Sequence, residues 1–238
     1  MWEYFKDFIN LFWIKNKPSP YEVGLFTKTQ KYCQYISWLP WLKMVAVCNS
    51  LSMYATKKEW SDIDLFIITA PKRLWLVRIS VTIIFQILWV RRYWKNIKER
   101  FCLSFFTTEN AMDFSKIAIQ NDIFLYYWIY FLKPIINRDS TYERFIKANK
   151  SLWISELNLN WDNKAYAIRS PKYFNSFDKS CILNIKDFIF KKIFLPRTLS
   201  HKKRLWDPFG LIVNDDMLKF TDNDRRIEIR DKLIGRIL

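Results

Sequence analysis

Short apolar runs alternate with longer amphipathic runs along the first half of the chain. A short apolar run that ends at polar or turn-forming residues is typical of a buried strand, and a longer run with spaced polar positions is typical of a helix. The pattern predicts strands over residues 44–48, 62–69 and 100–107. It predicts helices over residues 2–15, 21–38, 50–57 and 72–94.

Aromatic and basic helical runs dominate the second half. Helices are predicted over residues 121–132, 142–157 and 185–205, and from Asp222 onward. Residues 158–184 are irregular and rich in Asn, Ser and aromatic residues, which indicates a loop or a docking surface. A loop or strand is expected at residues 210–213. Asp215 and Asp216 are expected to cap helices, with Asp216 before Met217, or alternatively to lend a carboxylate to a distant site.

The order of predicted elements indicates the fold class. Residues 21–107 read helix, strand, short helix, strand, long helix and strand, which predicts an α/β unit. We therefore expect an α+β fold in which a small mixed sheet is flanked by helices. The expected parts are an N-terminal helix (1–20), an α/β domain (21–115) and a mostly helical C-terminal region (116–238). The 238 residues suit one domain with an extension, or two small domains.

Composition indicates a folded protein with a preference for anionic partners. Of all residues, 50% are hydrophobic and 18% aromatic, which is enough to bury a core. Lys and Arg number 39 against 23 Asp and Glu, a formal charge of +16. Such a surface attracts nucleic acid, nucleotides or an anionic membrane face. The charge therefore supports a phosphate-bearing partner without choosing among these three.

Cysteine, histidine and glycine usage argues against several kinds of site. A single histidine, His201, argues against zinc sites built from two or three histidines, and three glycines cannot form a GxGxxG or Walker loop. The N-terminal residues mix charges into the first turns, so no secretory signal is expected and the protein is predicted to be cytoplasmic. Buried free thiols are expected for the cysteines, which form no CxxC pair and lie in apolar runs. They are Cys33, Cys48, Cys102 and Cys181.

Residues 74–90 are almost wholly apolar and are followed by Arg91 and Arg92. The run is slightly short for a membrane span and contains Arg78 and Gln86, so a buried helix is expected instead. A peripheral membrane protein that uses this run and the two arginines is the alternative.

Asp62 and Asp64 are the candidates for chemistry, because they open the strand predicted over residues 62–69. Alternation along a strand places both carboxylates on one face and Ile63 on the other. Two such carboxylates can share a hard cation such as Mg²⁺, which also binds substrate phosphates. Upstream, backbone N–H groups and the Ser50 hydroxyl at a predicted helix start suit a triphosphate. The alternative for Asp62 is a helix or turn cap, with Asp64 in an exposed strand.

Residues 45–69 resemble the signature of the DNA-polymerase-beta-like nucleotidyltransferase superfamily. Its pattern is an apolar strand, Gly-Gly or Gly-Ser, a short interval, and then Asp-x-Asp or Asp-x-Glu in a second strand. The resemblance implies the mixed sheet of that superfamily, with Asp62 and Asp64 as catalytic residues and Mg²⁺ ligands. It also implies an NTP substrate whose phosphates lie against Asn49 and Ser50. The chain looks closest to small bacterial stand-alone nucleotidyltransferase-domain proteins.

Two positions depart from the superfamily pattern. Asn49 stands where Gly is usual, and Asn tolerates a left-handed backbone better than most residues. The superfamily usually adds a third carboxylate on a later strand, but Ser104 occupies the expected inward position in residues 101–106. Glu109 and Asp113 lie just beyond that strand and are the candidates to replace it.

The expected function is Mg²⁺-dependent transfer of a nucleoside monophosphate from an NTP to an unidentified acceptor. RNA or another phosphate-bearing molecule is the expected acceptor class. The alternative is a non-catalytic nucleotide- or RNA-binding module on the same fold, which the departures at Asn49 and Ser104 and the positive charge favour. The basic run at residues 91–100 either binds such phosphates or is the solvated end of the helix before it.

Overall fold

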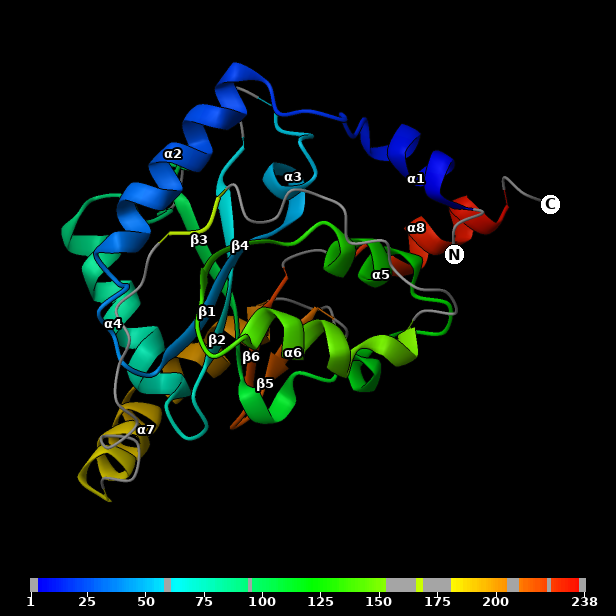
Figure 1. The fold of residues 1–238 in the computed structure, drawn as a ribbon. Coiled ribbons are helices and arrows are strands. Elements are labelled where there is room, and N and C mark those ends of the chain that lie inside the picture. Colours follow the sequence, from blue (N-terminus) through cyan, green and yellow to red (C-terminus); the bar gives the residue numbers. More distant parts are fainter. Residues whose placement is uncertain are drawn as a thin grey trace.

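A mixed six-stranded sheet lies at the centre of the fold (Figure 1). The computed structural model describes residues 4–57, 61–93, 96–152, 166–168, 181–204, 210–221 and 224–235. The strands are β1 (Leu42–Val47), β2 (Ile63–Thr69), β3 (Phe101–Thr108), β4 (Lys133–Asn137), β5 (Leu211–Val213) and β6 (Met217–Phe220). The prediction of an α+β fold with a mixed sheet flanked by helices is therefore confirmed.

The strands lie in the order β4-β1-β2-β3-β6-β5. β2 and β3 are parallel, and every other neighbouring pair is antiparallel. In register, Leu65 of β2 lies opposite Val47 of β1, and Asp64 lies opposite Cys102 of β3. This topology brings the C-terminal end of β1 and the N-terminal ends of β2 and β3 to the same edge of the sheet.

Helices cover both faces of the sheet (Figure 1). The α-helices are α1 (Phe5–Phe12), α2 (Pro20–Gln34), α3 (Asn49–Ser52), α4 (Leu74–Ile87), α5 (Ile123–Tyr130), α6 (Thr141–Ala148), α7 (Cys181–Arg204) and α8 (Arg226–Ile234). Short 3₁₀ turns are η2 (Glu109–Ala111), η3 (Phe114–Ile117) and η4 (Lys150–Leu152). Together they enclose two apolar layers, one on each face.

The strand sequences explain why both faces are buried. In β1, Val45 and Val47 face the layer under α2 and α4, whereas Met44 and Ala46 face the layer under α5 and α6. All four side chains are fully buried. A strand buried on both sides reads as a continuous apolar run, which is why the sequence marks β1 and β2 clearly. A third apolar cluster, around Phe8, joins α1 and α8 to α5.

Two strands of the second half were not predicted. β4 follows α5 after only two residues, and β6 begins at Met217, where a helix capped by Asp216 was expected. The helix prediction at Met217 is wrong because Met217–Phe220 pairs with both β3 and β5. Three of the six strands come after residue 115, so the two predicted main regions contribute to one sheet. Asp222 and most of residues 158–184 lie outside the described residues.

Several helices are shorter than predicted, and the C-terminal ends of α4 and α6 differ most from the prediction. α4 ends at Ile87 rather than near residue 94, because Trp89 adopts a left-handed backbone (φ 55°) that ends a helix. α6 ends at Ala148. The expectation that residues 74–90 form a buried helix is confirmed, since Leu74, Trp75 and Phe85 are at most 1% exposed. Among the helices of the described chain, none has the length and apolar character needed to span a membrane.

Candidate metal centre

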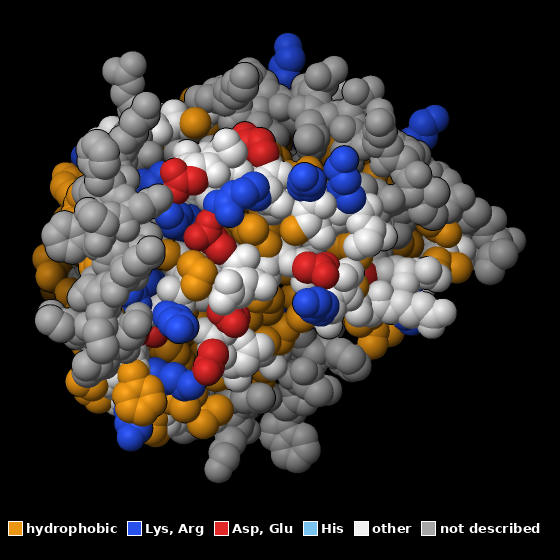
Figure 2. All heavy atoms as spheres, turned by 60° about the horizontal axis from the view of Figure 1, so that its bottom comes forward, with side chains coloured by type: hydrophobic (Ala, Val, Ile, Leu, Met, Phe, Trp, Pro, Cys, Tyr) orange, Lys and Arg blue, Asp and Glu red, His pale blue; other side chains and the backbone are white. Residues whose placement is uncertain are grey.

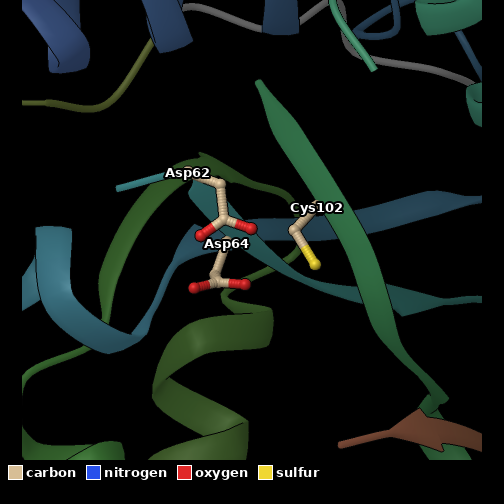
Figure 3. A group of neighbouring side chains, drawn as sticks. All are labelled: Asp62, Asp64 and Cys102. Atoms are coloured by element: carbon tan, nitrogen blue, oxygen red, sulfur yellow. The ribbon is translucent and has the colours of Figure 1, made fainter. Parts of the chain in front are cut away.

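The two aspartates lie where β2 begins, at the edge of the sheet that also holds the end of β1. Asp62 directly precedes β2 and Asp64 is its second residue. Between them, Ile63 is fully buried in the layer under α2 and α4, as the predicted alternation requires. Both carboxylates therefore lie on the other side of the strand and remain partly exposed. Figure 3 shows the two carboxylates close to each other.

A third side chain, Cys102, completes the group (Figure 3). One carboxylate oxygen of Asp62, one of Asp64 and the Cys102 Sγ all lie within 4.8 Å of one another. Among the described residues, no third carboxylate joins the pair at this distance. A thiol of β3, two residues before the expected position at Ser104, therefore lies opposite Asp64.

The prediction that every cysteine is buried in apolar surroundings is wrong for Cys102. Cys33 and Cys48 are at most 3% exposed and pack in the apolar layers, but Cys102 is partly exposed at the sheet edge. The side chain of Cys181 lies outside the described residues. Ser104, which was expected to point into the site, hydrogen-bonds with Cys102.

Asn49 positions Asp64 from the first residue of α3, just after β1. It adopts a left-handed backbone (φ 56°), so the prediction that the turn tolerates Asn at this position is confirmed. Its side-chain oxygen accepts a hydrogen bond from Trp128 Nε1 at 2.8 Å, and its side chain hydrogen-bonds with Asp64. Asn49 therefore connects α5 to the acidic pair. Its predicted contact with a nucleotide stays a prediction.

Ser50 is the second residue of α3, the single turn that follows β1. It is partly exposed. The turn is fixed to β2 by a hydrogen bond that the Cys48 N–H donates to the Asp64 backbone carbonyl at 3.1 Å. Ser50 therefore lies two residues after the point at which the chain bonds to Asp64, and its predicted phosphate contact stays a prediction.

The electrostatics of the pair depend on Arg92. Its Nη1 donates a hydrogen bond to Asp62 Oδ2 at 2.8 Å, and the Arg92 side chain is 38% exposed. Burial, followed by the charge of Asp62, raises the pKa of Asp64 to about 6. Hydrogen bonds with Asn49 and Cys102 and the charge of Arg92 oppose this shift. Two carboxylates in this position favour a cation between or beside them.

Arg92 comes from the basic run at residues 91–100, which is not the end of a helix. α4 stops at Ile87, and the Arg92 N–H donates a hydrogen bond to the Phe101 carbonyl at 2.9 Å. The interpretation of this run as a solvated helix end is therefore wrong. It connects α4 to β3 and carries a guanidinium to the acidic pair. Residues 94 and 95 lie outside the described chain.

Neither replacement for the third acid reaches the pair. Glu109 follows the far end of β3, seven positions after Cys102, which is about 23 Å along an extended strand. It forms an ion pair with Arg144 instead. Asp113 caps η3 by accepting a hydrogen bond from the Ser115 N–H at 3.0 Å. Asp215 pairs with Lys191, and Asp216 bonds with Thr108 at that same far end.

A buried glutamate supports the loop that leads to the site, and sequence reasoning missed it. Glu22 is fully buried and accepts hydrogen bonds from the N–H and hydroxyl of both Ser19 and Thr56. Ser19 and Glu22 form a capping box at the start of α2, and this pattern is visible in the sequence. The contact with Thr56 holds the residues directly after α3 against α2.

Comparisons with models of protein families, with curated proteins and with solved structures find no match. The resemblance of residues 45–69 to the nucleotidyltransferase superfamily therefore stays an expectation. The assignment of a function rests on the geometry of Asp62, Asp64 and their neighbours.

Proposed function

We propose that this protein is a metal-dependent nucleotidyltransferase whose cation binds at Asp62 and Asp64. The observation that carries the proposal is the pair of partly exposed carboxylates at the start of β2, next to the turn that begins α3. Their chemistry fits a divalent cation, because two adjacent carboxylates without a neighbouring cation repel each other. Within the described part of the chain, Arg92 donates a hydrogen bond to the Asp62 carboxylate and acts on Asp64 through its charge.

The residues of this site have separate roles in the proposed reaction. Asp62 and Asp64 hold Mg²⁺, which when bound offsets phosphate charge in a phosphoryl transfer. Asn49 orients the Asp64 carboxylate. Ser50 and the backbone of its turn contact the phosphates of an NTP. An acceptor hydroxyl or phosphate then attacks the α-phosphate, and pyrophosphate leaves.

The proposal is tested by NTP binding with and without Mg²⁺. We expect the wild-type chain to bind a labelled NTP only with Mg²⁺, and the Asp62→Ala/Asp64→Ala variant to lose this binding. Asp231→Ala, on the exposed side of α8, is the matched control and keeps wild-type affinity. Equal binding by the wild type and the double variant, or binding by neither, contradicts the proposal.

A non-catalytic nucleotide- or RNA-binding module is the second candidate, favoured by the thiol in place of a third carboxylate. The net charge of +16 also suits RNA. On the face in Figure 2, however, described basic and acidic side chains are interspersed rather than separated. Binding of RNA with steep salt dependence, without release of pyrophosphate from any NTP, would favour this candidate over a transferase.

A further inference from the structure

Cys102 differs from the other described cysteines in its surroundings. Cys33 and Cys48 belong to the apolar layers on the two faces of the sheet, and Cys102 belongs to neither. Its neighbours are polar: Asp64 lies opposite it on β2, and Ser104 hydrogen-bonds with it. Packing therefore does not account for a cysteine at this position.

The group has the dimensions of a three-ligand metal site. The two carboxylate oxygens and the Cys102 Sγ lie within 4.8 Å of one another, and they come from two adjacent parallel strands. In a tetrahedral zinc site, a sulfur and an oxygen ligand lie about 3.6 Å apart, given bonds of about 2.3 and 2.1 Å. Side-chain rotations that close the spacing by up to about 1 Å would bring all three atoms onto one ion.

The donor types decide which ions suit such a site. Mg²⁺ takes oxygen ligands and keeps its waters, so a sulfur adds little to its binding. Zn²⁺ and Co²⁺ accept thiolate and carboxylate together and are stable with three protein ligands and one open position.

We propose that Asp62, Asp64 and Cys102 together bind a thiophilic divalent cation of the Zn²⁺ or Co²⁺ class, with an open position for water or a phosphate oxygen. On binding, the Cys102 thiol releases its proton to water and the sulfur bonds to the ion. This inference rests on the proposed function, in which Asp62 and Asp64 hold a cation; it adds the third ligand and names an ion of the Zn²⁺ or Co²⁺ class, in place of Mg²⁺, as the one that binds most tightly.

Co²⁺ is the probe that tests the sulfur directly, because a thiolate bound to Co²⁺ gives a charge-transfer absorption in the near ultraviolet. The full-length chain is titrated with Co²⁺ under a reductant that does not bind metal, and binding is followed in parallel by calorimetry. We expect the band in the wild type and its loss in Cys102→Ser. The affinity for Zn²⁺ falls by at least about tenfold in the same variant.

Two further variants separate the sulfur ligand from general damage to the fold. Cys33→Ala removes a thiol remote from the site and keeps the band. Cys102→Asp loses the band but binds Mg²⁺ more tightly than the wild type, because the third ligand is then an oxygen.

Three results would overturn the inference, and they differ in whether they also overturn the proposed function. Calorimetric Co²⁺ binding that requires Asp62 and Asp64 but produces no thiolate band, or a band that persists in Cys102→Ser, overturns the assignment of Cys102 and leaves the proposed function intact. Failure of every divalent cation to bind the wild type overturns both.

Discussion

At the scale of single residues, the sequence identifies the acidic pair but not its third partner. Strand alternation places Asp62 and Asp64 on one face, and the order of strand, polar turn, helix start and acidic pair marks them as a candidate site. The place of Cys102 in the site depends on how β3 pairs with β2. The register of this pair shifts by one residue between Asp64 and Phe66. That shift places Cys102 opposite Asp64, and no local pattern in residues 101–106 indicates it. Which residues of two parallel strands lie opposite each other depends on the tertiary structure. The sequence therefore indicated Ser104 rather than Cys102 as the residue of β3 in the site.

Arg92 gives a prediction about cation affinity. Its guanidinium neutralises Asp62 and competes with a bound cation, so Arg92→Ala is expected to raise Mg²⁺ affinity about two- to fivefold, as for a partly exposed ion pair. Calorimetric titration with Mg²⁺ measures the change, and Arg92→Lys, which keeps the charge, shows less of it. Weaker Mg²⁺ binding by Arg92→Ala would contradict competition at Asp62.

Asn49 gives a prediction about stability. Asn49→Ala leaves the buried Trp128 Nε1 without its acceptor, which costs about 1–3 kcal/mol. It also places Ala at φ 56°, which costs roughly a further 1 kcal/mol. Asn49→Gly loses the hydrogen bond but has no backbone strain, so its free energy of unfolding falls less. Urea unfolding of the two variants measures the difference, and equal losses would show that the left-handed backbone is unimportant.

At the scale of elements, the sequence predicts the strands that polar segments separate clearly from their neighbours. β1, β2 and β3 are apolar runs between polar segments, and all three were predicted. β4 was missed because it follows the apolar helix α5 almost directly, and because Pro134 lies within it. Proline is tolerated there since β4 is an edge strand. β6 has only four residues, next to acids that resemble a helix cap.

The hydrogen bonds of Glu22, which join α2 to the residues after α3, give a prediction with a defined pH dependence. Burial raises the pKa of Glu22, but hydrogen bonds from Ser19 and Thr56 outweigh it and hold the pKa below its ordinary value. The ionised carboxylate therefore adds stability above the unfolded pKa of about 4.3, and this is lost as the pH falls through the folded pKa.

Glu22→Gln is the variant that tests these hydrogen bonds. We expect it to lower the free energy of unfolding at pH 7 by about 1–3 kcal/mol, with the difference from wild type shrinking below about pH 4. Urea unfolding across this pH range measures it, with Glu143→Gln on the exposed side of α6 as control. A difference that is constant with pH would rule out the ionised Glu22 as its source.

At the scale of the whole molecule, the C-terminal segment belongs to the same folded unit as the site. β6 pairs with β3, and α8 packs against α5. Arg226 of α8 is 6% exposed and bonds with Asp122 and Asp224, each at 2.9 Å. Asp122 caps α5, the helix whose Trp128 holds Asn49. The termini therefore support the elements that position the acidic pair.

Arg226 gives the prediction at this scale. Arg226→Met leaves the buried Asp122 without its ion pair and Asp224 with Lys219 alone, which is expected to cost about 3 kcal/mol of the free energy of unfolding. The neighbouring Arg225 is 55% exposed, and Arg225→Met is expected to cost less than about 0.5 kcal/mol. Thermal and urea unfolding compare the two variants. Equal effects would mean that the buried network does not anchor α8.

The central claim, that a divalent cation binds at Asp62 and Asp64, is tested most directly by anomalous diffraction from crystals soaked in Mn²⁺. Mn²⁺ binds the same oxygen ligands as Mg²⁺, and its anomalous scattering locates it in the crystal. The account predicts a peak about 2.2 Å from an oxygen of each carboxylate, with Arg92 turned away from Asp62. Crystals in which no Mn²⁺ peak lies at the pair, and in which Arg92 still bonds to Asp62, would contradict it.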